Sequence, residues 1–154
     1  MNDAADARTA DWGERTGGAL VDLTIAFALF VAGIVLGSIA ISAGDWGVAV
    51  GVLLIVAGTL AATLYAPLML SRQGAANGIT IGKRAAGLRV LRNDKRPIGF
   101  WLGVLREFVL PILIGILLTG GLFWLVDALW PLFDDQDRAI HDIVCETRVV
   151  KLQP

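Results

Sequence analysis

The sequence predicts an all-α membrane protein with two transmembrane helices that form a hairpin, a third bent or re-entrant hydrophobic helical region, and a small cytoplasmic strand pair. Apolar residues make up 56% of the 154 residues, which exceeds the ~45–50% of ordinary soluble domains. Two long apolar runs are separated by one short turn, and a basic segment follows the second run. We expect one membrane domain over residues 19–151, between tails at residues 1–18 and 152–154.

Residues 19–41 predict the first transmembrane helix, because this apolar run contains a single charge, Asp22. At ~1.5 Å per residue the run is long enough to cross a hydrocarbon core of ~30 Å. A cleaved signal peptide fits less well, since acidic residues precede the run where a signal peptide carries basic ones. Residues 46–70 carry no charge and predict the second helix. The turn at residues 42–45 is short, so the two helices form a hairpin.

The segment 71–99 orients this hairpin, because it contains seven basic residues and one acid, Asp94. Cytoplasmic loops next to transmembrane helices carry an excess of lysine and arginine. We therefore expect residues 1–18 and 71–99 in the cytoplasm and the turn at residues 42–45 outside a cell membrane. Within the segment, three residues are expected to face anionic lipid headgroups: Lys83, Arg84 and Arg89.

The third apolar region, residues 100–133, is too long for one perpendicular helix, which would extend about 51 Å. Pro111 and the Thr119-Gly120-Gly121 triplet are candidate breaking points. A single crossing would leave the C-terminus outside, whereas a re-entrant hairpin would return it to the cytoplasm.

Two short segments favour the re-entrant alternative. Residues 88–91 and 148–151 combine β-branched, apolar and polar residues as short strands do. Isolated strands are unstable in water, so we expect these two to pair. Pairing requires both segments on the same side of the membrane, which places residues 134–154 in the cytoplasm.

Four segments of the chain resemble the RDD family of small membrane proteins. They are ERTGGALVD from Glu14, TIGKRAAGLRV from Thr80, Arg106-Glu107, and RAIHDIVCETRVV from Arg138. The resemblance runs from about residue 12 to 151, and Cys145-Glu146 departs from the small residues that usually precede the threonine. The family is named for one arginine and two aspartates, which the resemblance assigns to Arg15, Asp22 and Asp142. It implies a role in transport of mostly unidentified ligands, with cation/proton exchange proposed for some members.

Asp22 is the first candidate functional residue, because a carboxylate inside a span costs ~2.5–3.5 kcal/mol unless it is partnered or hydrated. It forms an ion or proton site on the helical face shared with Arg15, or a structural ion pair with a cytoplasmic basic residue such as Arg106. Asp127 is expected to be a second, unpaired intramembrane acid if the third region is re-entrant, and it ranks below Asp22 because the family is not named for it.

Charged residues elsewhere have simpler interpretations. Arg106 and Glu107 either lie at the membrane interface or point into the helix bundle; the interface is favoured, since long side chains extend toward the headgroups. The spacing of Arg138 and Asp142 predicts an ordinary i, i+4 helical ion pair. His141 acts as a pH sensor or is merely a satisfied surface residue.

Several function classes are excluded by composition and motif. The net charge of −1 and a basic segment without interleaved aromatics argue against nucleic-acid binding. One cysteine, Cys145, excludes an internal disulfide, and with the single histidine it cannot form a zinc site of soft ligands. Residues 77–84 begin with Asn and end with Arg, so they do not form a phosphate-binding loop. We expect no enzyme activity, no metal and no cofactor.

Glycines spaced four apart suggest close helix contacts. Gly33 and Gly37 lie in the first span, and Gly47 and Gly51 in the second. They pack the hairpin internally or join copies of the chain into a homo-oligomer. Two functions remain: a transporter or transport component that uses Asp22 and works as an oligomer, and a non-catalytic accessory subunit that binds a partner protein or lipid.

Overall fold

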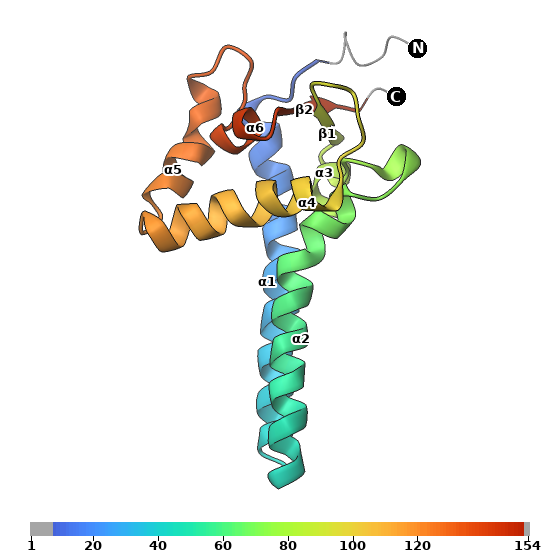
Figure 1. Cartoon of the computed structure of the whole chain (residues 1–154), viewed down its shortest axis with the longest axis vertical. Helices are drawn as coiled ribbons and strands as arrows, with labels where there is room; N and C mark the ends of the chain where they lie inside the picture. The colour runs from blue at the N-terminus through green and yellow to red at the C-terminus, as the bar shows by residue number, and fades with distance from the viewer. Residues whose placement is uncertain (1–7, 153–154) are drawn as a thin grey trace.

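The computed structural model describes residues 8–152, apart from the side chain of Leu117. Helices α1 (Trp12–Ile41) and α2 (Asp45–Leu70) form a long hairpin that projects from a head made by the rest of the chain (Figure 1). Both are long and apolar enough to cross a membrane. The predicted hairpin is therefore confirmed. The expectations for tail residues 1–7 and 153–154 lie outside the described residues.

Helix α1 begins at Trp12, earlier than the predicted span, because Asp11 caps it. The Asp11 carboxylate accepts a hydrogen bond from the Glu14 backbone N–H at 2.9 Å, and the Glu14 carboxylate accepts one from the Asp11 N–H at 3.2 Å. This reciprocal capping box satisfies two backbone donors at the helix start. The first turns of α1 therefore belong to the head, and the apolar remainder forms the hairpin.

Glycines allow the two long helices to pack with their backbones in close contact. A Cβ atom added at Gly33 would lie 2.7 Å from the Gly58 Cα, and one added at Gly37 would lie 2.6 Å from the Gly51 carbonyl oxygen. Contacts this short are not tolerated by any side chain. Of the two roles expected of the spaced glycines, packing within the hairpin is the one that these contacts support.

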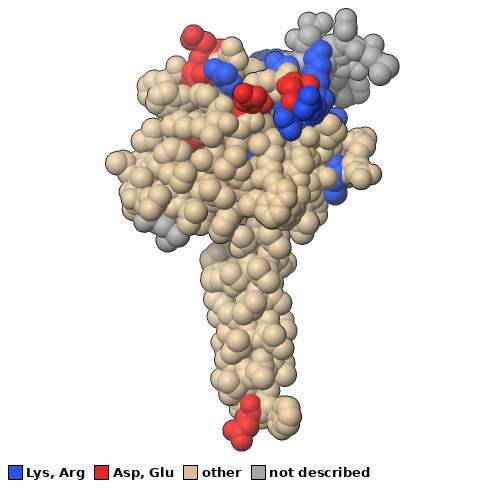
Figure 2. Space-filling view, in the orientation of Figure 1, with Lys and Arg blue, Asp and Glu red and all other residues tan. Residues whose placement is uncertain are grey.

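The length of the hairpin matches a bilayer core. Asp22 and Tyr65 lie at the end near the head, and Asp45 begins α2 at the far turn. The helix between Asp22 and the end of α1 is about 30 Å long. Figure 2 shows a shaft without charge between the head and its tip. Asp22 therefore lies at the edge of the apolar shaft and not at its centre.

The third apolar region does not form a continuous helix. It comprises α4 (Phe100–Val104), a π-helix η2 (Leu105–Leu118), α5 (Leu122–Leu129) and a short 3-10 helix η3 (Trp130–Leu132). In Figure 1, α4 and the π-helix lie across the head end of the hairpin, and α5 turns back toward the rest of the head. Within residues 8–152, only α1 and α2 have the length of a span.

One of the two predicted breaking points is where the chain turns. Gly120 and Gly121 have φ values of 61° and 93°, which residues with a side chain rarely adopt. Pro111 remains inside the π-helix. A proline lacks the N–H that would complete a regular α-turn, so it fits a segment whose hydrogen bonding is already altered.

The predicted strand pair is confirmed. Strands β1 (Leu88–Arg92) and β2 (Thr147–Lys151) are antiparallel, with Val90 opposite Val149. The N-terminal segment extends this sheet, because the Ala10 N–H donates to the Val149 carbonyl and the Lys151 N–H to the Arg8 carbonyl, both at 3.0 Å. The sheet forms the centre of a small core: Ala10, Leu70, Leu88, Val90, Ile98 and Val149.

Short helices complete the head and carry side chains of the candidate site. The 3-10 helix η1 (Gly74–Ala76) and α3 (Ile81–Ala85) lie between α2 and β1, and α6 (Ile140–Val144) precedes β2. Residues before α1 and those of β2 meet in one sheet, so both ends of the described chain lie in the head (Figure 1).

Replacing Gly33 by alanine is expected to destabilise the hairpin. The added methyl group would collide with Gly58 and force the helices apart, an overpacking effect of about 1–3 kcal/mol. Thermal unfolding in detergent micelles measures the loss. Gly17→Ala is the matched control in the same helix, because a Cβ there meets nothing within 4 Å. Equal melting temperatures for the two variants would contradict this packing.

Cysteine labelling with an impermeant reagent tests the predicted orientation. A cysteine at Ala43 is expected to react from outside the cell, and one at Gln136 only after the membrane is opened. Native Cys145 is 5% exposed, and burial raises the pKa of its thiol to about 11, so it reacts slowly; replacing it by alanine removes the remaining background. Labelling of Gln136→Cys from outside would show that the orientation is wrong.

Candidate functional site

The head contains a continuous series of charged side chains where the hairpin joins it. Each member lies within 4 Å of an acidic or basic partner in the series. The described residues place eight of them together, and we call this set the charge network: Arg15, Asp22, Lys83, Arg106, Glu107, Asp127, His141 and Asp142.

Asp142, in the first turn of α6, is the centre of the network and is fully buried. Its Oδ1 accepts hydrogen bonds from the Arg106 guanidinium at 2.7 and 3.2 Å and from the Thr147 hydroxyl at 3.1 Å. Its Oδ2 forms an ion pair with Arg15. Burial opposes ionisation, but the charges of Arg106 and Arg15 outweigh it and hold the pKa of Asp142 well below its usual range.

The Arg106 side chain points into the head, which is the less favoured of its two expected arrangements. Its side chain is only 3% exposed and lies between Asp142 and Glu107. The Arg106 side chain does not extend toward the headgroups, because two carboxylates inside the head bind its guanidinium. A guanidinium with several directed donors is well suited to join two acids in this way.

Asp22 is held by hydrogen bonds from two other helices and the turn before one of them. Tyr65 of α2 and the Gly82 N–H of α3 each donate to Oδ1 at 2.8 Å, and the Thr80 hydroxyl donates to Oδ2 at 2.5 Å. Gly82 is required for this approach, since a Cβ there would lie 2.7 Å from the Asp22 carboxyl carbon. Asp22 therefore ties α1 to α2 and α3.

The predicted partners of Asp22 are consequently wrong. Both Arg15 and Arg106 pair with Asp142. Arg15 lies about 10 Å away from Asp22 along α1, at the level where α6 contacts the helix. The only cation paired with Asp22 among the described residues is Lys83, at 3.6 Å.

The Lys83 side chain points into the head and does not face lipid as expected. Its ammonium lies 3.6 Å from both the Asp22 and the Glu107 carboxylates, and its side chain is 12% exposed. Arg84, its neighbour in α3, is exposed, and its contact with headgroups stays a prediction. Arg89 is half-buried and donates from Nε to the Asn77 carbonyl at 2.9 Å.

Asp127 and His141 form the far end of the network. Asp127 of α5 is 5% exposed and accepts hydrogen bonds from the His141 backbone N–H at 2.7 Å and from its ring Nδ1 at 2.6 Å. The other ring nitrogen lies 3.7 Å from Asp142. Asp127 is thus not the unpaired acid that its sequence position suggested.

The predicted pair between Arg138 and Asp142 does not form. Arg138 binds Asp134, four residues before it, at 3.1 Å. The residues between Asp134 and α6 form a turn, with Asp137 at a φ of 53°, so the α-helix that would place Arg138 over Asp142 does not extend that far. Asp142 therefore pairs with Arg15 and Arg106 instead.

Sequence reasoning missed the neutral members of the site: Tyr65, Thr80 and Thr147. One signal was available, because Tyr65 is the only tyrosine of the chain and its hydroxyl lies near the end of an otherwise apolar run. A buried hydroxyl in such a run needs a partner. Thr80 caps α3 by accepting a hydrogen bond from the Lys83 N–H. A capping pattern in the sequence predicts this role of Thr80 but not its contact with Asp22.

Asp142→Asn is expected to destabilise the protein by about 3–5 kcal/mol, because it leaves two buried guanidinium groups without their shared carboxylate. Because the pKa of Asp142 is lowered in the folded protein, its ionised carboxylate contributes fully to stability at pH values above ~3.9, the pKa of free aspartate. This contribution is lost as the pH falls toward the lower pKa of the folded protein. Thermal melts at pH 7 measure the effect. Asp94→Asn, which removes an exposed partner of Arg92, serves as control; similar losses for both variants would contradict a central role for Asp142.

Comparison with known proteins identifies the family of the chain. The model of the RDD family matches residues 9–146, a range that contains every member of the charge network. No curated protein and no solved structure matches the chain significantly. The family's named residues, which the resemblance assigns to Arg15, Asp22 and Asp142, all lie in the network. With its two long apolar helices, the chain is a membrane protein that belongs to the RDD family.

Proposed function

We propose that this protein is a component of a monovalent cation/proton exchanger that works as an oligomer, with the charge network as its ion-handling site. The observation that carries the proposal is a charge imbalance. Four carboxylates face three permanent cations in the network, so it is short of one positive charge while His141 is neutral. The acids are Asp22, Glu107, Asp127 and Asp142, and the cations are Arg15, Lys83 and Arg106.

An unbalanced charge in this position favours uptake of one cation or one proton. Most of these side chains are buried, Arg106, Asp127 and Asp142 almost completely, and an uncompensated buried charge is costly. A proton on His141 restores balance, and a bound monovalent cation does so equally well. The two then compete for the same deficit, which is the thermodynamic requirement for exchange.

His141 is positioned to accept that proton. Asp127 of α5 faces one ring nitrogen and Asp142 of α6 faces the other, and Asp142 also contacts Arg106 of the π-helix and Arg15 of α1. Two carboxylates stabilise an imidazolium, and the more distant guanidinium groups oppose it.

An oligomer is required because one copy provides no path through the shaft. The glycine contacts between α1 and α2 leave no space between these helices. One cavity of the described residues lies in the segment after α2, and an apolar groove follows the outer face of α1; neither passes between the two helices. A path for ions would therefore run between copies, next to the face of α1 that carries Asp22.

A second function is favoured by the bonding of Asp22. Its oxygens accept three hydrogen bonds from neutral groups, from Tyr65, Thr80 and Gly82, which is the pattern of a structural clamp. In that case the protein is a non-catalytic accessory subunit, and its exposed apolar helices bind a partner protein or lipid.

Asp22→Asn is expected to abolish cation-dependent proton flux in liposomes while the fold persists. The asparagine oxygen still accepts the Gly82 N–H, but three carboxylates would then face three cations and the network would need neither proton nor cation. Flux is followed with an internal pH dye after addition of Na⁺ or K⁺. Asp45→Asn, which removes the acid at the far turn, is the control and is expected to keep full flux.

Thermal melts of the same samples separate the two functions. Loss of flux with an unchanged melting temperature supports the exchanger. Absence of flux in the wild-type protein, together with a lower melting temperature for Asp22→Asn, supports the accessory subunit with Asp22 as a clamp. Full flux in Asp22→Asn would refute the role of the charge imbalance.

A further inference from the structure

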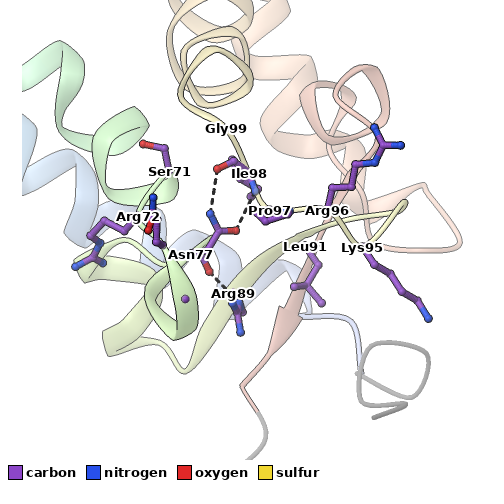
Figure 3. Close-up of a pocket in the computed structure, with 12 residues that line it drawn as sticks. Ser71, Arg72, Asn77, Arg89, Leu91, Lys95, Arg96, Pro97, Ile98 and Gly99 are labelled. Carbon is purple, nitrogen blue, oxygen red and sulfur yellow. Dashed lines mark hydrogen bonds between the residues drawn. The ribbon is translucent and has the colours of Figure 1, made fainter.

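A basic cavity lies in the head, distinct from the charge network. It is formed where the chain leaves α2, by η1, β1 and the segment that leads into α4, and has a volume of about 530 Å³. Figure 3 shows the residues that surround it. Its lining contains four basic residues and no acid: Arg72, Arg89, Lys95 and Arg96.

The floor of the cavity is held rigidly by Asn77. Its side-chain amide donates to the Leu70 and Ile98 carbonyls at 3.1 and 3.0 Å and accepts from the Ile98 N–H at 2.9 Å. Its backbone carbonyl accepts from Arg89 Nε at 2.9 Å. This last bond fixes the Arg89 guanidinium beside the cavity through one of its nitrogens. The site is therefore pre-organised around a cation.

The rim of the cavity is exposed and rich in positive charge. Lys95 and Arg96 extend outward from the segment before Pro97 (Figure 3). The nearby acid, Asp94, does not line the cavity; its carboxylate binds Arg92 at 2.6 Å and lies 3.8 Å from Arg96. One acid thus faces two arginines, Arg92 and Arg96, and the rim keeps a net positive charge toward an anion that approaches it.

The position of the cavity at the end of α2 indicates which kind of anion it would bind. Ser71, in its lining, caps the end of the spanning helix α2, and Gly99 precedes α4. Two large apolar side chains next to these residues, Leu68 and Trp101, are 54% and 79% exposed. A basic cavity beside exposed apolar groups at the end of a span matches a molecule with an anionic head and an acyl tail.

We propose that this cavity binds a phosphate group, supplied by the headgroup of an anionic phospholipid such as phosphatidylglycerol. Arg89 holds the phosphate at the floor, Lys95 and Arg96 attract it at the rim, and the acyl chains lie along Leu68 and Trp101. A planar guanidinium with free N–H groups is a suitable phosphate ligand. This proposal is independent of the ion exchange proposed above.

Titration of the purified full chain in neutral detergent tests the cavity. Short-chain phosphatidylglycerol, phosphatidylcholine and inorganic phosphate are added separately, and bound molecules are counted by native mass spectrometry with melting temperature as a second readout. We expect saturable binding of one phosphatidylglycerol per chain, and weaker binding of phosphatidylcholine, whose choline offsets the phosphate charge. The double variant Lys95→Gln, Arg96→Gln is expected to weaken binding roughly thirtyfold.

The double variant Arg8→Gln, Arg138→Gln is the matched control, because it removes two basic residues of the head that do not line the cavity. It is expected to bind phosphatidylglycerol like the wild type. Equal weakening in both double variants would mean that phosphatidylglycerol is attracted only by the overall positive charge of the head, and would overturn the proposal. The absence of saturable binding would overturn it as well. Inorganic phosphate binding as tightly as the lipid, with the same dependence on Lys95 and Arg96, would overturn the lipid as the source of the phosphate.

Discussion

The ion pairs of Asp142 with Arg15 and Arg106 are the interaction on which the head depends. They join the first turns of α1, the π-helix of the third region and α6, which are far apart in the sequence. None of the three charges can be left alone, because an unpaired charge in this buried position costs several kcal/mol. The position of the third region relative to the hairpin is therefore fixed by charge as much as by apolar packing, which is limited in so small a core.

A second constraint comes from the bilayer that the hairpin fits. The shaft between Asp22 and the far turn has the length of a hydrocarbon core, and the polar contacts of Asp22 with Tyr65 and Thr80 lie at its edge. The third region meets the hairpin at this level, where Gly103 packs against Pro67. A chain that lies across the end of a hairpin can expose apolar side chains without spanning, which explains how residues 100–133 are apolar yet too interrupted for one helix.

The sequence predicted the elements that depend on local composition and missed the contacts that depend on the fold. Apolar runs define the hairpin, glycines mark the turn at residues 120–121, and alternating residues define the strand pair. The partners of Asp22 and Asp142 could not be inferred in the same way. Spacing along one helix suggested Arg15 for the first and Arg138 for the second, whereas the fold brings Arg15 to Asp142 and the backbone turn at Asp137 carries Arg138 away.

The same residues therefore serve stability and supply the charge imbalance. A network with equal numbers of acids and cations would hold the head together and would have no reason to bind a proton. Here the arginines neutralise Asp142 and Glu107, Lys83 is shared by Glu107 and Asp22, and Asp127 is left with His141 as its partner. The deficit can be shared along this series, because each ion pair polarises the next. In the proposed exchanger, a charge gained at the His141 end is felt through these pairs at the Asp22 end, beside the apolar shaft.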